Sequence, residues 1–335
     1  MRNLVVGGNG LIGSHIVEIL LNRGKRVKVI SKPGSSLGTI EPYSDDIEVV
    51  ECDIRDRESI GIAMKKCDYV YHLAASHLLW ERDSRIYQEV NVSGTRNVAD
   101  AAVRNNVKRI VYTSTCDIMG RSQRKAGKLG DEDGFPDGDL NEIGPYGRSK
   151  IEAEKVLRKK TNGIEVIVVH PTCPIGKNDT LPTEPGKMIE AVIQGNLGGY
   201  VDRRMNFVHV KDCALGHVLA MERGVHGERY ILGGENIELK NFIERVAKLA
   251  GVRAPRIAVP YFIATSSAYL FEFISKITGK RPKASIEGVG LIRHDFVFSS
   301  EKAKRELGYT TGQLNFAIEE AVDWHRKRLN IEKKY

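Results

Sequence analysis

Two side chains in the segment YGRSK have the types and the spacing for proton transfer. Tyr146 and Lys150 stand four residues apart at the start of a helical run, so both lie on one face of the predicted helix. An ammonium group beside a phenol favours the ionised phenol and lowers its pKa from about 10. We therefore expect Tyr146 to exchange a proton near neutral pH. Helices often contain this spacing by chance as two solvated side chains, so its meaning depends on the rest of the chain.

A glycine-rich turn near the start of the chain provides a context for this pair. An apolar run at residues 4–6 predicts a strand, GGNGLIG follows it, and a helical pattern leads to a second strand at residues 27–30. Gly7, Gly10 and Gly13 allow a sharp turn, close packing of helix on strand, and the approach of a pyrophosphate to the helix N-terminus. We interpret the unit as a dinucleotide-binding βαβ motif, and the alternative is a purely structural turn.

The residues after the second strand indicate which dinucleotide is bound. A carboxylate there would accept hydrogen bonds from both ribose hydroxyls and favour NAD, but this chain has Ser31 and Lys32 instead. A cation together with the hydroxyls of Ser35 and Ser36 suits a 2′-phosphate. We therefore expect NADP as the cofactor, with NAD as the alternative if Lys32 is an ordinary solvated lysine.

Polar residues also follow two other predicted strands. The run RIVYTST ends in hydroxyls at the sheet edge where ligands of this architecture bind, and Thr115 is placed to hold a substrate oxygen beside Tyr146. Its neighbour Ser114 points to the opposite face, so only one of the two should face the pocket. Asp53, in ECDIRD, is placed to meet the adenine edge, and the alternative is a helix N-cap for the segment beginning near Arg55.

The order of the predicted elements defines the fold class. Further runs typical of buried strands occur at residues 47–50, 69–73, 110–113 and 164–169, with helical patterns between them. This alternation predicts an α/β fold, a Rossmann-like doubly wound and mostly parallel sheet.

The chain resembles the extended short-chain dehydrogenases/reductases, of the NAD-dependent epimerase/dehydratase superfamily. The motifs GGNGLIG, CDIRD, YHLAAS, NVSGTRNV, YTSTCDIMG, YGRSK and HPTCPIG occur in the family's order and approximate spacing. When the chain is aligned on Gly120, the family's catalytic Ser or Thr falls at Thr115, and Tyr146 and Lys150 complete the triad. The resemblance also implies cofactor contacts from Leu11, Ile12, Ile54, Leu73, Ala74, Ala75, Asn91, Pro171 and Thr172.

Within the superfamily, HPTCPIGKND, PTEPGKM, NFVHVKDCALGH and GERYILGGEN look most like the dihydroflavonol-4-reductase-like branch, which also contains proteins named as hopanoid-associated sugar epimerases. NADP-dependent members of that branch carry a basic residue where this chain has Lys32. Nucleotide-sugar epimerases hold their substrate with an Asn and an Arg at positions that are Cys173 and Met205 here. Neither side chain donates the hydrogen bonds that a diphosphate needs, although Arg203 and Arg204 lie close by in sequence.

These observations predict an NADP(H)-dependent oxidoreductase that transfers hydride to or from a ketone or aldehyde of a small organic substrate. Tyr146 is the expected proton donor, Lys150 positions the ribose, and Thr115 binds the carbonyl oxygen. The alternative is a nucleotide-sugar epimerase or dehydratase with tightly bound NAD(P). A dinucleotide-binding protein without catalysis is disfavoured, because all three residues are present.

The resemblance also implies two interleaved domains. Residues 1–176, with 206–232 returning to them, form the dinucleotide-binding domain, and residues 177–205 and 233–335 form a smaller, mainly helical substrate domain. Residues 121–144 are rich in Gly, Asp and Lys, which predicts a long loop over the sheet edge of the kind that often covers an active site.

Composition narrows the partners. Lys and Arg number 51 against 43 Asp and Glu, a surplus of +8 that suits phosphate-bearing ligands but more often solvates a surface, and we expect no nucleic acid partner. The apolar stretch at 257–274 is interrupted by polar residues, so we expect a packed helix, with membrane-surface contact as the alternative and no stable membrane insertion.

Five cysteines without zinc-ligand spacing, and a start without a secretory signal, favour reduced thiols, no metal and a cytoplasmic location. The helices after Tyr87 and Tyr146 resemble those through which family members pair, so we expect a homodimer.

Overall fold

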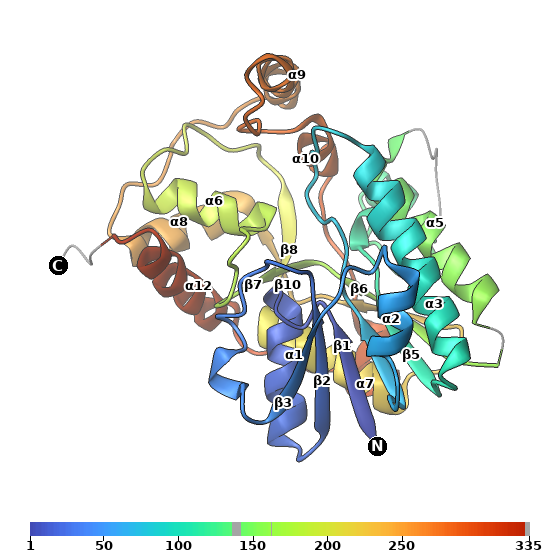
Figure 1. Cartoon of the computed structure of the whole chain (residues 1–335). Coiled ribbons are helices and arrows are strands. Elements are labelled where there is room, and N and C mark those ends of the chain that lie inside the picture. The colour runs from blue at the N-terminus through green and yellow to red at the C-terminus, as the bar shows by residue number, and fades with distance from the viewer. Residues whose placement is uncertain (136–141, 162, 332–335) are drawn as a thin grey trace.

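The structure, a computed structural model, describes residues 1–135, 142–161 and 163–331 (Figure 1). Its main sheet has seven strands, and each neighbouring pair is parallel. In spatial order they are β3 (Ile47–Glu51), β2 (Arg26–Ser31), β1 (Arg2–Val6), β4 (Tyr69–His72), β5 (Arg109–Thr113), β6 (Glu165–Pro171) and β9 (Arg229–Leu232). The predicted doubly wound fold class is therefore confirmed.

The strands form because their apolar runs are buried on both faces of the sheet. Successive side chains alternate, so Val5, Val29 and Val111 belong to the core on one face, and Leu4 and Ile110 to the core on the other. The chain order reverses between β1 and β4, where Val6 pairs with His72. In such sheets ligands bind beyond the carboxyl ends of the strands at this reversal.

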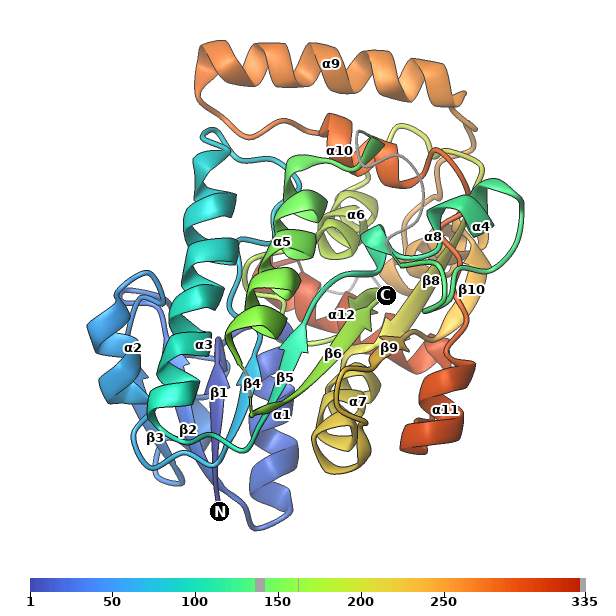
Figure 2. The ribbon, with the colours of Figure 1, turned by 90° about the vertical axis from the view of Figure 1, so that its right-hand side faces the viewer.

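Helices cover both faces of the main sheet. One face carries α1 (Leu11–Asn22) and α7 (Val210–Arg223), which pack against each other. The other carries α2 (Arg57–Ala63), a π-helical segment η2 (Tyr87–Gly94) that continues as α3 (Thr95–Arg104), and α5 (Pro145–Lys160). Figure 2 shows α3 and α5 side by side, in agreement with their contacts.

A second, smaller sheet lies beyond the carboxyl ends of the main strands. It has the order β10 (Glu235–Glu238), β8 (Arg204–His209), β7 (Cys173–Ile175). In the segment predicted to return to the main sheet, α7 covers one face of that sheet and β9 adds its last strand, whereas β8 belongs to the small sheet. The remaining helices are α4 (Arg121–Lys125), α6 (Glu184–Ile193), α8 (Leu239–Ala250), α9 (Tyr261–Thr278), α10 (Ile286–Leu291), α11 (Glu301–Leu307) and α12 (Leu314–Arg328). The two-domain division at the predicted boundaries stays a prediction.

Two expectations for the second half of the chain change. The segment 121–144 is not a continuous loop, because it begins with α4 and Gly130 bridges to Phe298, and its residues 136–141 lie outside the described residues. The stretch 257–274 was expected to pack into the protein, but α9 buries only Ala268 and Ser275. In the described part of the chain, no helix is long and apolar enough to cross a bilayer.

Candidate active site

The glycine turn joins β1 to α1 beneath the end of β4. Gly7 has a φ of +86°, and a Cβ on it would lie 3.0 Å from the amide nitrogen of Ala74. A Cβ on Gly13 would collide with the carbonyl oxygen of Gly7. Gly10 is the N-cap of α1, which has no side-chain cap and no acidic residue in its first turn. The turn therefore leaves the first amides of α1, beside the half-buried Leu11, able to receive a diphosphate.

The loop after β2 folds onto this turn. Asn9 donates from Nδ2 to Ser35 Oγ and to the Ser36 carbonyl oxygen, both at 3.0 Å, and Ser35 Oγ donates to the Lys32 carbonyl oxygen at 2.6 Å. Lys32 itself is exposed. Ser31 is buried, and its hydroxyl has no hydrogen-bond partner within the described ranges. All four predicted residues thus lie together beside the glycine turn, with the lysine side chain open to solvent.

Asp53 lies at the end of the neighbouring strand β3. Its carboxylate accepts from the Arg55 amide at 2.9 Å and from the Arg55 guanidinium, and this pairing holds its pKa below the usual value, with a smaller contribution from the Lys32 charge. The helix N-cap is Asp56, which accepts from two first-turn amides of α2, so the N-cap alternative for Asp53 is wrong. Asp53 lines an open surface pocket with Arg55, Asp56, Glu89 and Ser93.

The other residues that the resemblance implied divide into backbone and packing positions. The amides of Leu73 and Ala74 donate to the Val6 carbonyl oxygen at 3.0 and 2.9 Å, which continues the β1–β4 pairing into the loop containing Ala75. Ile54 is buried. On the first turn of α1, Ile12 is half-buried like Leu11.

Asn91 is buried in η2 and connects two parts of the site. Its Oδ1 accepts from the Ser76 amide at 2.8 Å, and its Nδ2 donates to the Ser76 carbonyl oxygen at 3.0 Å and to Ser149 Oγ at 2.9 Å. Since all these contacts are within the protein, Asn91 positions the loop after β4 against α5.

The chain directly after β6 contributes a hydroxyl oxygen that has no hydrogen-bond partner among the described residues. Pro171 ends the strand, and the amide of Thr172 donates to the Leu232 carbonyl oxygen at 3.4 Å. The buried Thr172 Oγ1 has no partner in the part of the chain that the structure describes, and the same is true of Ser114 Oγ. Buried hydroxyls normally have partners. The crowded glycine turn, the uncapped N-terminus of α1 and these two hydroxyls all lie at the carboxyl edge of the sheet. Such an edge suits a polar ligand, and a dinucleotide is a ligand of this kind.

Helix α5 carries Tyr146 and Lys150, the two residues predicted to transfer a proton and to position the ribose. It begins with Gly144 as N-cap and Pro145 in its first turn. Lys150 is 3% exposed, its Nζ donates to the Thr113 carbonyl oxygen at 2.7 Å, and it lies 4.5 Å from the centre of the Tyr112 ring. Burial lowers the pKa of Lys150 to about 7, and the charge of Glu154 opposes this shift.

Tyr146 lies one helical turn earlier, and its phenol lies close enough to the Thr115 side chain to interact with it, so the two predicted residues come together. Burial raises the pKa of Tyr146, the charges of Asp117 and Glu287 raise it further, and the Thr115 contact opposes the shift. We expected Lys150 to lower the pKa of Tyr146, and this expectation is wrong for the protein without bound ligands. The reason is that desolvation dominates and the Lys150 ammonium donates to Thr113 instead.

Sequence reasoning missed the two carboxyl groups beside Tyr146. Glu287 of α10 accepts from the amides of Tyr146 and Gly147 at 3.3 and 3.2 Å, and a Cβ on Gly144 would collide with it. Burial raises the pKa of Glu287 to about 7, and the charge of Asp117 adds to that shift. No sequence signal joins Glu287 to a tyrosine 141 positions away.

Asp117 differs because it follows Thr115 within one motif and could have been noticed. It is buried, its Oδ1 accepts from Arg121 at 3.0 Å, and burial raises its pKa. Its Oδ2 has no hydrogen-bond partner among the described residues, and a Cβ on Gly147 would lie 2.6 Å from this atom. The phenol thus lies near the Thr115 hydroxyl and the Asp117 carboxyl group of one segment, and near the Glu287 carboxyl group of a distant segment.

The fold and the comparisons define a dinucleotide-dependent enzyme. Residues 3–233 match the NAD dependent epimerase/dehydratase family, and the chain belongs to that family. The prediction of an NAD(P)-dependent short-chain dehydrogenase/reductase of the extended type is confirmed.

Similar proteins extend along nearly the whole chain. A Synechocystis protein named provisionally as a dihydroflavonol 4-reductase is 31% identical over 325 residues, covering 96% of this chain and 93% of that protein. Sterol demethylase protein B of Methylococcus capsulatus is 28% identical over 340 residues, covering 98% and 99%. The crystal structure of gox2253 is similar with a TM-score of 0.85 and 33% identity, covering 99% of each chain.

Proposed function

We propose that this chain is an NADP(H)-dependent oxidoreductase that moves hydride to or from the ketone or aldehyde carbon of a small organic substrate. The observation that carries the proposal is the contact between the Thr115 and Tyr146 side chains at the carboxyl edge of the sheet, with the buried Lys150 one turn along the same helix. The relative named as a reductase supports this choice within the family.

Tyr146, Thr115 and Lys150 each have a separate role in the proposed reaction. A bound nicotinamide dinucleotide would supply the hydride. Tyr146, held protonated by burial and by the neighbouring carboxyl groups, gives its phenolic proton to the substrate oxygen during reduction. Thr115 Oγ1 accepts from the Asp117 amide at 3.2 Å, which orients the hydroxyl, and its hydrogen would bond the substrate oxygen as charge develops there. Lys150 positions the ribose, and its ammonium offers hydrogen bonds to ribose hydroxyls.

The direct test follows NADPH oxidation at 340 nm against a panel of ketones and aldehydes. We expect turnover with at least one carbonyl class and none when sugar nucleotides replace it. A protein that interconverts sugar nucleotides without net oxidation of added NADPH would instead support the epimerase alternative.

The described side chains give that alternative limited support. Cys173 is buried in β7, and Met205 lies in β8. Of the two arginines that could replace the missing donors, Arg204 pairs with Asp295 at 2.8 Å and Arg203 donates to the Asp202 carbonyl oxygen at 2.8 Å. These contacts hold both guanidinium groups in place and use part of their donor capacity.

The choice of NADP rests on Lys32. In a Lys32→Glu variant we expect the ratio of kcat/KM for NADPH over that for NADH to fall about tenfold or more, because a cation near a 2′-phosphate is replaced by an anion. Steady-state kinetics with both cofactors measure this ratio. Lys25→Glu, an exposed lysine at the opposite end of the same strand, serves as the control and should leave the ratio unchanged. An unchanged ratio in Lys32→Glu would remove the argument for NADP.

Glu287 should influence when the phenol ionises. Above a pH of about 7 its carboxylate is charged and keeps Tyr146 protonated, so Glu287→Gln should let the phenol ionise at lower pH. We expect the rising limb of the pH profile for alcohol oxidation to move down by about one pH unit, with a similar plateau. The measurement is kcat/KM against pH.

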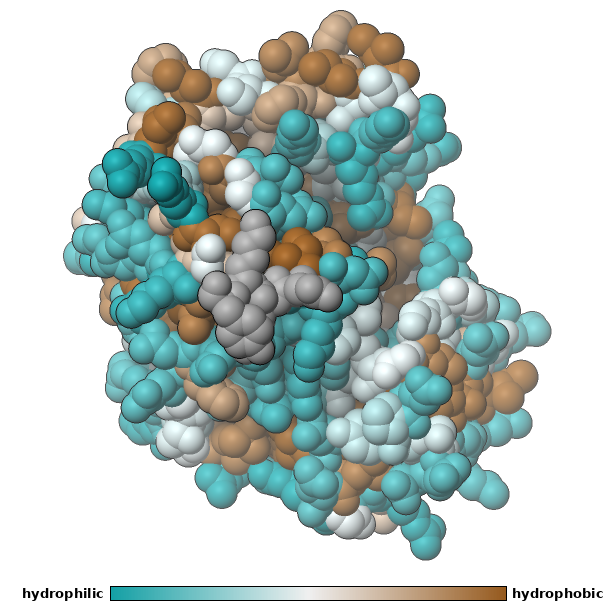
Figure 3. All heavy atoms as spheres, turned by 90° about the vertical axis from the view of Figure 1, so that its left-hand side faces the viewer, coloured by the Kyte–Doolittle hydropathy of each residue, from teal (hydrophilic) through white to brown (hydrophobic). Residues whose placement is uncertain are grey.

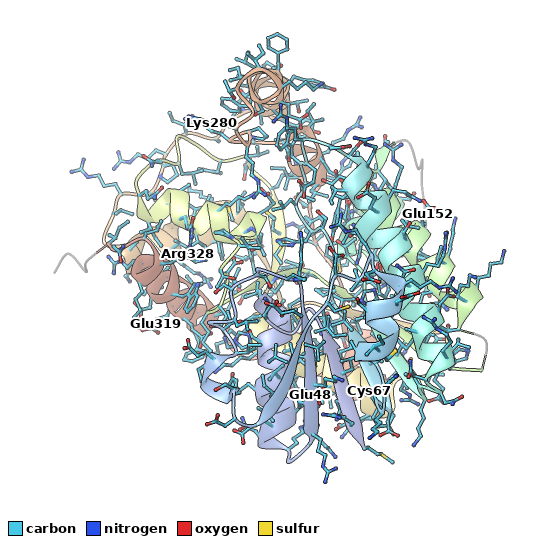
Figure 4. The ribbon with its side chains drawn as sticks, viewed as in Figure 1. Glu48, Cys67, Glu152, Lys280, Glu319 and Arg328 are labelled. Carbon is cyan, nitrogen blue, oxygen red and sulfur yellow. The ribbon has the colours of Figure 1, made fainter. Side chains whose placement is uncertain are left out.

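Glu152→Gln is the matched control, because Glu152 is exposed on the same helix α5 and lies at the outer side of the helical layer (Figure 4). Equal pH profiles for the Glu287 and Glu152 variants would show that Glu287 has no influence on the phenol and only caps the helix.

We also infer a cytoplasmic location and a homodimer formed through the layer of η2, α3 and α5. The side-by-side packing of α3 and α5 in Figure 2 supports the pairing surface that the family resemblance implies. Light scattering behind size exclusion should give twice the mass of the chain, and a single-chain mass would contradict the dimer.

A further inference from the structure

Helix α9 stands apart from the rest of the protein. Figures 1 and 2 show it at the top of the molecule, beyond α10 and far from the main sheet. It has 18 residues, of which only Ala268 and Ser275 are buried. Its acidic residue, Glu272, accepts the Ile286 amide at 2.7 Å, so this carboxylate is engaged by the segment that leads into α10.

The outer side of α9 is apolar over its whole length. Its exposed large side chains follow one another at helical spacings and share one broad face. The polar side chain within that face, Ser266, donates to the Phe262 carbonyl oxygen at 2.9 Å and therefore needs no water. The face consists of Phe262 (69% exposed), Ile263 (43%), Tyr269 (60%), Leu270 (56%), Phe273 (62%), Ile274 (43%) and Ile277 (72%). Figure 3 shows hydrophobic side chains along this top edge.

Basic side chains are concentrated in α9 and in the chain segments on either side of it. Residues 253–283 contain six Lys and Arg and a single acid, Glu272. Figure 4 places Lys280 beside α9. All six are exposed, and among the residues that the structure describes none of them forms an ion pair. They are Arg253, Arg256, Lys276, Lys280, Arg281 and Lys283.

We propose that α9 is an interfacial helix that binds the surface of a lipid bilayer containing anionic lipids. An exposed apolar face of this size on a helix marks an interaction surface. Its combination with unpaired cations is the pattern of helices that lie in the headgroup region, with the apolar side chains buried among acyl chains and the cations at phosphate. Tyr269 has the amphipathic ring that is enriched at this depth.

The charges favour a bilayer over a second copy of the chain as the occupant. Two copies packed through α9 would bring their cations together, and Glu272, which could offset them, is already engaged by Ile286. An anionic bilayer instead supplies negative charge for Lys276 and for the cations that precede and follow the helix. The dimer surface inferred above lies on η2, α3 and α5, so both contacts could exist at once.

The surface also lies on the side of the molecule that holds the candidate site. Helix α9 packs against α10, and α10 carries Glu287, which contacts the first turn of α5. Binding through α9 would therefore place the Tyr146 end of α5 toward the bilayer. The proposal itself rests only on α9 and its surroundings, and it stands or falls independently of the proposed reaction.

The test is flotation of the full chain with vesicles of phosphatidylcholine alone or with 30% phosphatidylglycerol, a composition chosen to supply anionic headgroups. We expect the protein to float with the anionic vesicles and to remain mostly below with the neutral ones. The double variant Phe273→Asp, Ile277→Asp should bind at least tenfold more weakly, and so should Lys280→Glu, Arg281→Glu.

Matched controls separate binding from folding. Ile62→Asp changes an exposed apolar residue of α2, and Lys25→Glu with Lys65→Glu reverses two exposed lysines far from α9. These variants should float like the unchanged protein, and all variants should keep its Tm. Failure of the unchanged protein to float with anionic vesicles would overturn the proposal. Normal flotation of the α9 variants would also overturn the proposal. If these variants instead lost only a dimer that the unchanged protein forms, a second copy of the chain would be the occupant of this face, which would overturn it as well.

Discussion

Tyr146→Phe is expected to lower kcat for carbonyl reduction by about 10³-fold, within the range for loss of a positioned general acid. The variant keeps the ring and the packing of α5 but has no proton to give to the substrate oxygen. Because the proton is transferred only in the transition state, kcat and kcat/KM should fall together, with little change in KM. Steady-state assays at 340 nm on the substrate found in the panel would measure this.

Tyr87→Phe is a demanding control for this prediction. Tyr87 is buried in η2 with its ring centre 6.3 Å from that of Tyr146, and its hydroxyl donates to the Leu78 carbonyl oxygen at 2.6 Å. Its loss should cost about 1 kcal/mol of stability and leave turnover nearly intact. Full turnover in Tyr146→Phe, or equal losses in both variants, would remove Tyr146 as the proton donor.

Lys150→Met is expected to abolish most turnover and to change how stability depends on pH. Lys150 has a pKa of about 7 in the folded protein against 10.5 when unperturbed, so between these values the unfolded chain binds more protons than the folded one. The free energy of unfolding therefore rises with pH in this window. Below a pH of about 7 the folded protein must hold a buried ammonium, and stability is lower.

The methionine variant lacks this dependence. Between pH 6 and pH 9 the unchanged protein should gain about 2 kcal/mol of stability relative to Lys150→Met. Urea unfolding at several pH values measures the difference, and the comparison cancels every other titrating group. Lys155→Met, an exposed lysine on the same helix, should show no such trend. A constant difference between the unchanged protein and Lys150→Met would show that folding does not lower the pKa of Lys150.

The elements that carry the candidate site could be predicted from the sequence because their signals are local. The glycine turn, the strand runs and the four-residue spacing of Tyr146 and Lys150 each depend on neighbours within one element, and the structure contains them as predicted. The placement of Thr115 on the same side of the sheet edge as Tyr146 was also expected, because ligands of this architecture bind at the carboxyl ends of the strands.

The environment of that site was decided by the tertiary structure. The pKa of Tyr146 depends on how deeply the phenol is buried and on Asp117 and Glu287, and packing brings Glu287 in from a distant segment. The same holds for α9, whose apolar residues resembled a core helix until their exposure was known. Periodicity along one element shows which side chains share a face, but desolvation and charge depend on what the rest of the chain places against that face.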